Sequence, residues 1–170
     1  MSARDSQRAK VYAAEEFVRT VFDRAAARGS RTVEFFGANL TLPPEARFGS
    51  VAAVQAYVDE VLALPAVREQ WPDPGPLTVR ERRGVAAAHY EKAHDEQRAG
   101  TAVVAVPARG GANWAMRELV VLHELAHHLC AADPPHGPRF VATLCTLAAL
   151  VMGPEVGHVL RVVYAREGVS

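Results

Sequence analysis

The run His123-Glu-Leu-Ala-His127 places two histidines four residues apart, with a glutamate directly after the first. Residues four apart on an α-helix lie one above the other on the same face. Both imidazoles can therefore reach a common point about 2 Å from one nitrogen of each ring, which is the length of a Zn–N bond. Glu124 lies about 100° around the helix, so its carboxylate would sit beside that point. The spacing predicts a helix that binds zinc through both histidines, with Glu124 as general base for a bound water.

The sequence around this motif is strongly apolar. Leucine and valine occupy residues 119–122, and Leu125, Ala126 and Leu129 follow. A helix of this composition is largely buried, and a buried ionisable group needs a partner or a metal ion to offset its desolvation. The context therefore favours a metal site over a chance HExxH pattern on a solvated helix.

Two residues beyond the helix compete for the place of third ligand. Asp133 lies six residues past His127, where sites of the HExxHxxGxxH type have theirs, but Cys130 occupies the position at which those sites need a glycine for the turn. His136 follows two prolines that end the helix, and Pro138 can begin the next one. His136 is the preferred third ligand, and Asp133, read as a helix-terminating turn, is the alternative.

Other residues could join or support the site. Glu155 and His158 are more distant alternatives, because some zincins take a carboxylate from a later helix; for both, a place at the surface or at the edge of the core is expected instead. Cys130 lies near the ligand face but is expected to pack beneath the site as a small hydrophobe. His128 lies on the same side of the helix as Glu124, where we expect it to support Glu124 or to be solvated.

The run HELAHHLC, followed by DPPHGPRF, resembles the active-site helix and the His-Gly-x-x-Phe segment of SprT-like zincins. In that family the histidine before the glycine is the third zinc ligand. The resemblance implies that His123, His127 and His136 bind zinc and that Glu124 is the catalytic acid and base. Residues 4–15 (RDSQRAKVYAAE) also resemble the start of a small family of uncharacterised actinobacterial metallohydrolases, and this likeness covers most of the chain.

Composition and length narrow the function further. We expect one domain over residues 1–170, long enough to bury a substantial core. The formal net charge is zero, and no zinc ribbon or nucleic-acid module is evident, so no nucleic-acid partner is expected. No run approaches the ~18 apolar residues of a membrane span, and residues 1–7 lack the apolar core of a signal peptide. We therefore expect a cytoplasmic protein without a membrane partner. Cys130 and Cys145 predict no disulfide framework.

The hydrophobic pattern predicts an α+β fold in which a small, mostly antiparallel sheet packs on helices. The resemblance implies that this fold is zincin-like and that its helices include the HExxH helix. Expected helices cover residues 5–28, a stretch capped by Ser50, and residues 138–151 and 154–166; expected strands cover residues 32–36, 77–82, 86–91 and 101–106. We expect a turn at residues 37–39 and a hairpin around Gly84 that joins strands 77–82 and 86–91. Asn113 is the expected N-cap of the motif helix.

These predictions favour metal-assisted hydrolysis, and a metallopeptidase is the preferred interpretation. An exposed edge of the sheet could bind a peptide or protein substrate by strand addition. His89, Tyr90 and His94 are expected on the sheet surface, with Tyr90 as a possible donor to an oxyanion. Two alternatives stay open: a zinc-stabilised interaction module without catalysis, whose fourth zinc position would be closed by Asp133 or Cys130, and a regulatory protease of the repressor-cleaving type.

Overall fold

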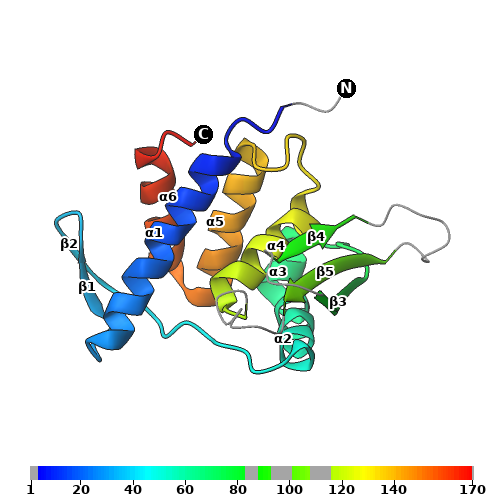
Figure 1. The fold of residues 1–170 in the computed structure, drawn as a ribbon, viewed down its shortest axis with the longest axis horizontal. Coiled ribbons are helices and arrows are strands. Elements are labelled where there is room, and N and C mark those ends of the chain that lie inside the picture. The colour runs from blue at the N-terminus through cyan, green and yellow to red at the C-terminus, as the bar shows by residue number, and fades with distance from the viewer. Residues whose placement is uncertain (1–3, 83–87, 93–100, 108–115, 170) are drawn as a thin grey trace. The chain divides into compact units, whose positions relative to one another are not determined.

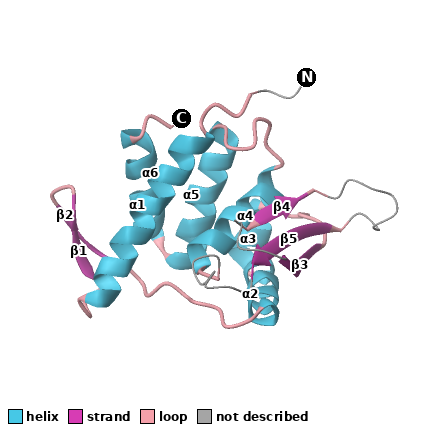
Figure 2. Cartoon of the chain, in the orientation of Figure 1, coloured by secondary structure: helices cyan, strands magenta, loops and turns pink. Residues whose placement is uncertain are grey.

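The computed structural model describes residues 4–82, 88–92, 101–107 and 116–169 (Figure 1). It confirms the predicted α+β class: the described residues form six helices and two small sheets (Figure 2). The chain divides into two compact units, which are described separately. The terminal unit contains residues 1–45 and 131–170, and the central unit contains residues 46–130. The expectation of one domain over residues 1–170 stays a prediction.

The terminal unit is built on three helices and one hairpin. Helices α1 (Arg8–Ala27), α5 (Pro138–Met152) and α6 (Pro154–Arg166) agree closely with the predicted ranges. Helix α6 packs against both α1 and α5. Proline occupies the first turn of α5 and of α6, where its missing N–H costs no intrahelical hydrogen bond. The core of this unit is apolar and includes Val11, Val18, Phe140, Leu147, Val156 and Leu160.

The hairpin of the terminal unit turns earlier than predicted. Strand β1 (Thr32–Phe35) pairs with β2 (Ala38–Thr41), so the turn is Phe36-Gly37 and not residues 37–39. Both turn residues have positive φ, 47° and 83°, which matches a tight two-residue turn but is unusual for phenylalanine. The ring of Phe36 stacks on Phe17 at 6.3 Å, and the guanidinium of Arg166 lies 4.0 Å from the ring centroid. These contacts offset the backbone strain.

The central unit contains α2 (Val51–Ala63), α3 (Pro65–Gln70), β3 (Leu77–Arg82), β4 (His89–Glu91), β5 (Ala102–Pro107) and α4 (Glu118–Cys130). The predicted cap of α2 is confirmed, because the Ser50 hydroxyl accepts a hydrogen bond from the Ala53 amide at 3.1 Å. Two other positions, His94 and the expected cap Asn113, lie outside the described residues.

The three-stranded sheet differs from the predicted hairpin arrangement. Its strand order is β3-β5-β4, so the described strands β3 and β4 do not pair with each other, and the predicted turn at Gly84 lies outside the described residues. Strand β5 runs parallel to β3 and antiparallel to β4, which makes the sheet mixed rather than mostly antiparallel. The reason is burial: nearly every residue of β5 is buried, whereas β3 alternates between buried and exposed positions in its first half. The most apolar strand therefore takes the centre of the sheet.

Helix α4 is the most buried helix of the central unit and contacts α2, β4 and β5. Its first residue, Glu118, fixes its N-terminal end. The Glu118 carboxylate accepts hydrogen bonds from the Ala46 amide at 2.8 Å and from the Tyr57 hydroxyl at 2.6 Å. The Glu118 amide in turn donates to the Ala46 carbonyl at 3.0 Å. A helix held in this way presents its side chains in a fixed orientation.

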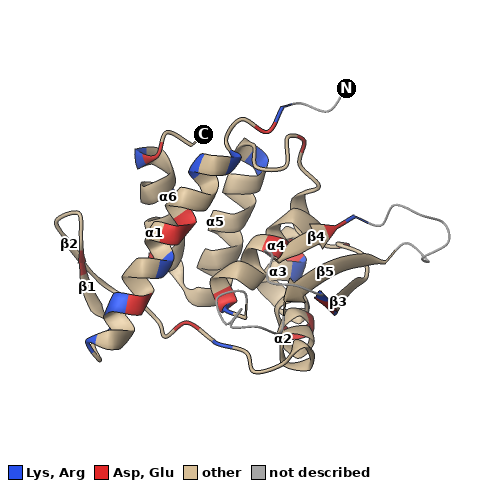
Figure 3. Ribbon diagram, viewed as in Figure 1, with Lys and Arg blue, Asp and Glu red and all other residues tan. Residues whose placement is uncertain are grey.

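Acidic and basic positions are interspersed along α1 and over the other elements (Figure 3), in keeping with a formal net charge of zero. In the described ranges, no helix combines the length and the apolar character that a membrane span requires.

Gly157 permits the close approach of α6 to α5. A Cβ atom at this position would lie 2.6 Å from the Cβ of Ala149 and 2.8 Å from the carbonyl oxygen of Cys145. We predict that Gly157→Ala lowers the free energy of unfolding by about 1–3 kcal/mol because of overpacking, although alanine has the better helix propensity by about 1 kcal/mol. Urea unfolding followed by circular dichroism measures the change. Gly49→Ala, which meets no atom within 4 Å, is the control; stabilisation by Gly157→Ala would contradict the close packing.

Candidate metal centre

Helix α4 brings the two motif histidines together as predicted. The Nε2 atoms of His123 and His127 lie 3.2 Å apart, and the two ring planes meet at 75°. Two imidazole nitrogens bound to one tetrahedral zinc ion at about 2.0–2.1 Å would be separated by about 3.3–3.4 Å. The observed separation fits this geometry. His123 is only 2 % exposed, so its polar ring is held in a site shielded from solvent.

His136 completes a group of three. One candidate ligand atom from each of His123, His127 and His136 lies within 4.8 Å of the others. His123 and His136 are buried and His127 is half-buried, and the group could hold a metal ion. Of the residues that the structure describes, no others form a comparable group of three or more His, Cys, Asp or Glu side chains. The alternative ligands Asp133 and Glu155 are therefore not part of it, and neither is Cys130.

The backbone after α4 explains how His136 follows the helix so closely. Helix α4 ends at Cys130, and Ala131 has a φ of 42°, which turns the chain out of the helical path. Pro138 then begins α5, two residues after His136. The third histidine is thus confined to a short segment between two helix ends, as the Pro-Pro and Gly-Pro pattern predicted.

The ring of His136 is oriented by a residue that the sequence did not identify. Its Nδ1 atom lies 2.7 Å from Oδ2 of Asp5, and only 5 % of His136 is exposed. Because the carboxylate accepts the Nδ1–H, the lone pair of the neutral ring is on Nε2. Metal-binding histidines in proteins usually donate their other N–H in this way. The Asp5–His136 pair therefore fits a metal ligand held by its Nε2 atom.

Aromatic side chains enclose the same ring. The Tyr12 ring lies 5.3 Å from that of His136, and the Phe140 ring lies 5.1 Å from it at an angle of 72°. Phe140 is the aromatic residue of the His-Gly-x-x-Phe segment and is fully buried. Phe140 lies four residues after His136, in the first turn of α5. From this position its large apolar ring packs against His136 and supports it.

Glu124 occupies the position after His123 on α4 and is 3 % exposed. This places a carboxylate in the same buried stretch of helix as two of the three histidines. A carboxylate in such surroundings is suited to accept and donate a proton, which is the role predicted from the sequence.

His128 has partners that the sequence did not reveal, and it is buried rather than solvated, with 9 % exposed. Its Nε2 atom lies 3.2 Å from the Gly75 carbonyl oxygen and its Nδ1 atom lies 3.2 Å from the Tyr90 hydroxyl. The Tyr90 ring is also nearly parallel to that of His127, with centroids 6.4 Å apart. Tyr90 is therefore not simply a residue of the sheet surface, because it joins β4 to the end of the motif helix.

The chemistry of these partners fixes the protonation of His128. A carbonyl can only accept a hydrogen bond, so Nε2 of His128 must carry the proton, and Nδ1 then accepts from the Tyr90 hydroxyl. Burial lowers the pKa of His128, against a smaller opposing effect of the Gly75 carbonyl. Burial, with a contribution from Cys130, raises the pKa of Tyr90. Both effects favour the neutral forms that this hydrogen-bonded chain requires.

Comparison of the chain with protein-family models, with curated proteins and with solved structures gave no match. Function must therefore be inferred from the histidine group and from the residues packed around it.

We predict that His128 is a neutral imidazole protonated at Nε2 near neutral pH, and ¹⁵N NMR of the histidine side chains can test this. Tyr90→Phe should lower the free energy of unfolding by about 1–2 kcal/mol, because it leaves Nδ1 of buried His128 without its donor. A wild-type spectrum with the proton on Nδ1, or a Tyr90→Phe variant of unchanged stability, would contradict the assignment.

Proposed function

We propose that this protein is a zinc-dependent hydrolase that cleaves amide bonds in peptides or proteins. The observation that carries the proposal is the group formed by His123, His127 and His136, on and directly after the helix that carries buried Glu124. Three protein nitrogens and an open fourth position are typical of catalytic zinc sites, whereas structural sites are closed by four protein ligands. The resemblance of the motif segments to SprT-like zincins supports the same hydrolase function.

The chain supplies the proton transfers that such a reaction needs. Bound zinc would lower the pKa of a water molecule and polarise the scissile carbonyl. Glu124 would accept the proton of the attacking water and deliver it to the nitrogen of the leaving amine, acting first as base and then as acid. Asp5, which accepts from Nδ1 of His136, would keep that ring in the required tautomer throughout.

The sheet of the central unit supports a peptide as the substrate. Strand β4 lies at one edge of the sheet and, within the described residues, pairs only with β5. It also contacts α4, and its residue Tyr90 stacks beside His127. An extended peptide that added to the free edge of β4 would therefore pass next to a proposed ligand.

The alternatives make different demands on the same residues. An interaction module with a closed zinc site needs a fourth protein ligand, but neither Asp133 nor Cys130 joins the three histidines. A repressor-cleaving type of protease would take its third ligand from a later helix, such as Glu155 in α6, and Glu155 is also outside the group. The group with His136 favours the hydrolase.

The first experiment measures the metal content of the purified protein by elemental analysis. We predict one equivalent of zinc in the wild type and loss of most of it in His136→Ala, because two histidines alone leave the metal with too few ligands. Asp133→Ala is the matched control and should keep its zinc. Loss of zinc in Asp133→Ala but not in His136→Ala would assign the third ligand to Asp133 instead. Absence of zinc from the wild type after reloading would overturn the proposal.

The second experiment separates catalysis from metal binding. We predict that Glu124→Gln keeps stoichiometric zinc but loses about 10²–10⁴-fold of the wild-type rate on a fluorogenic peptide library, because the amide cannot act as a base. Glu60→Gln, at an exposed position on α2, should retain the full rate. Wild-type activity in Glu124→Gln would remove this residue from the mechanism. Zinc binding without hydrolysis of any library member by the wild type would favour the interaction module.

A further inference from the structure

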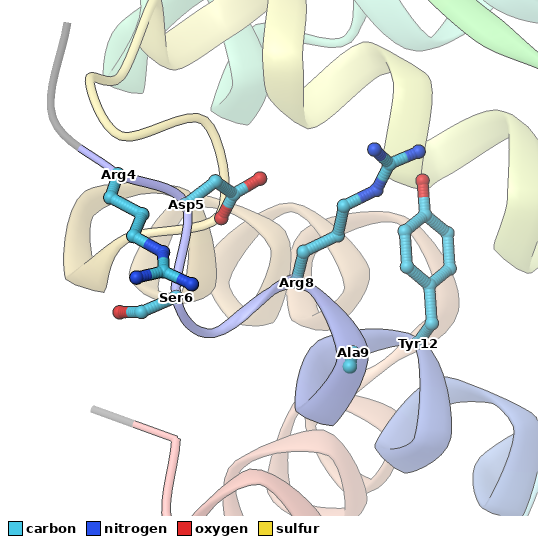
Figure 4. A pocket seen from close by; sticks show the side chains of 6 residues that line it. All are labelled: Arg4, Asp5, Ser6, Arg8, Ala9 and Tyr12. Atoms are coloured by element: carbon cyan, nitrogen blue, oxygen red, sulfur yellow. The ribbon is translucent and has the colours of Figure 1, made fainter.

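The segment before α1 and the first turns of that helix line a pocket of about 510 Å³ in the terminal unit (Figure 4). Its lining residues are Arg4, Asp5, Ser6, Arg8, Ala9 and Tyr12. Residues of the pocket wall also hold the proposed ligand His136. Asp5 accepts the hydrogen bond from its Nδ1 atom, and the Tyr12 ring lies 5.3 Å from its ring. The pocket therefore adjoins the histidine group through His136.

The pocket carries two guanidinium groups that are available to a ligand. Arg4 and Arg8 are exposed, and within the described part of the chain neither forms an ion pair. In Figure 4 the side chains of Arg8 and Tyr12 extend in the same direction from α1, and Arg4 lies on the other side of Asp5. The guanidinium carbon of Arg8 is 5.6 Å from the Tyr12 ring centroid, a contact that limits the freedom of the arginine side chain.

The one acidic residue of the pocket does not cancel this charge. Asp5 directs Oδ2 to His136, and its Oδ1 atom is buried without a hydrogen-bond partner. Two guanidinium groups against one carboxylate leave a net positive pocket. The planar fork of an arginine binds a carboxylate through two parallel hydrogen bonds, so this charge pattern selects for a carboxylate ligand.

We infer that this pocket binds a carboxylate group of the substrate and thereby selects which amide bond reaches the histidine group; the inference rests on the proposed hydrolase function. The path from His136 to the Tyr12 ring and on to Arg8 consists of two steps of 5.3 and 5.6 Å. An extended peptide covers this path with about three residues. The carboxylate recognised is thus either the C-terminus of the peptide or an acidic side chain close to the cleaved bond.

Binding to the zinc-loaded Glu124→Gln variant tests the inference without turnover. The probes are N-acetyl-alanyl-alanine, its C-terminal amide, and N-acetyl-alanyl-aspartic acid α-amide, whose side-chain carboxylate is free, each titrated by isothermal calorimetry. We expect the free acid to bind at least about tenfold more tightly than the alanyl amide, the effect of a charge-assisted hydrogen bond. Binding of the aspartyl α-amide that equals or exceeds that of the free acid would identify an acidic side chain as the source of the carboxylate.

Variants of the two arginines assign the effect to this pocket. Arg8→Gln and Arg4→Gln, each made in the Glu124→Gln background, should bring the acid and the alanyl amide close to equal affinity. Arg8→Lys should retain part of the preference, because it keeps the charge but loses the fork. Arg28→Gln, which changes an exposed arginine at the other end of α1, is the matched control and should keep the full preference.

Equal or undetectable binding of all three probes, or a carboxylate preference that survives both arginine-to-glutamine changes, would overturn the inference. Zinc is measured in the same samples, so the two proposals fail in different ways. A wild-type protein without zinc overturns the hydrolase. A zinc-loaded protein that binds neither carboxylate probe more tightly than the alanyl amide overturns only the carboxylate pocket.

Discussion

The rest of the candidate site depends on two imidazole rings that meet edge to face on a buried helix, with their Nε2 atoms 3.2 Å apart. Lone pairs on both atoms would repel, so either one nitrogen donates a proton to the other or a metal ion lies between them. Only a helix that cannot shift keeps this separation. Helix α4 is fixed near one end by Glu118, which bonds the Ala46 amide and the Tyr57 hydroxyl, and near the other by His128.

His128 is the neighbour of the proposed ligand His127 and is not itself one of the three grouped histidines. It lies one residue after His127, and its ring links α4 to the Gly75 carbonyl and to Tyr90 of the edge strand β4. The same tyrosine stacks beside His127. One hydrogen bond thereby joins the strand edge that could bind a peptide to the helix that carries two proposed ligands. In the proposed enzyme, this bond would fix the distance between the substrate strand and the metal centre.

The sequence predicted what depends on local spacing and failed where distant segments meet. The i, i+4 rule placed His123 and His127, and proline positions indicated where α5 and α6 begin. Asp5 could not be found in this way, because 131 residues separate it from its partner His136. The predicted strand order was wrong because the burial of β5, and not the glycine between β3 and β4, decides which strand lies at the centre of the sheet. The turn at Phe36 was missed because contacts with Phe17 and Arg166 offset a strained φ.

Asp5 connects the two proposals physically. Its Oδ2 atom accepts from His136, and its backbone places it between Arg4 and Arg8 in the wall of the pocket. The negative charge of Asp5 would strengthen metal binding by making the His136 ring more basic, and it would also oppose the entry of a second carboxylate. With zinc bound to the histidines, the positive charge beside His136 would weaken that opposition. Since coupling between two sites is reciprocal, a carboxylate held by the arginines would in turn favour the metal-bound state, so a substrate with this group would stabilise the centre that cleaves it.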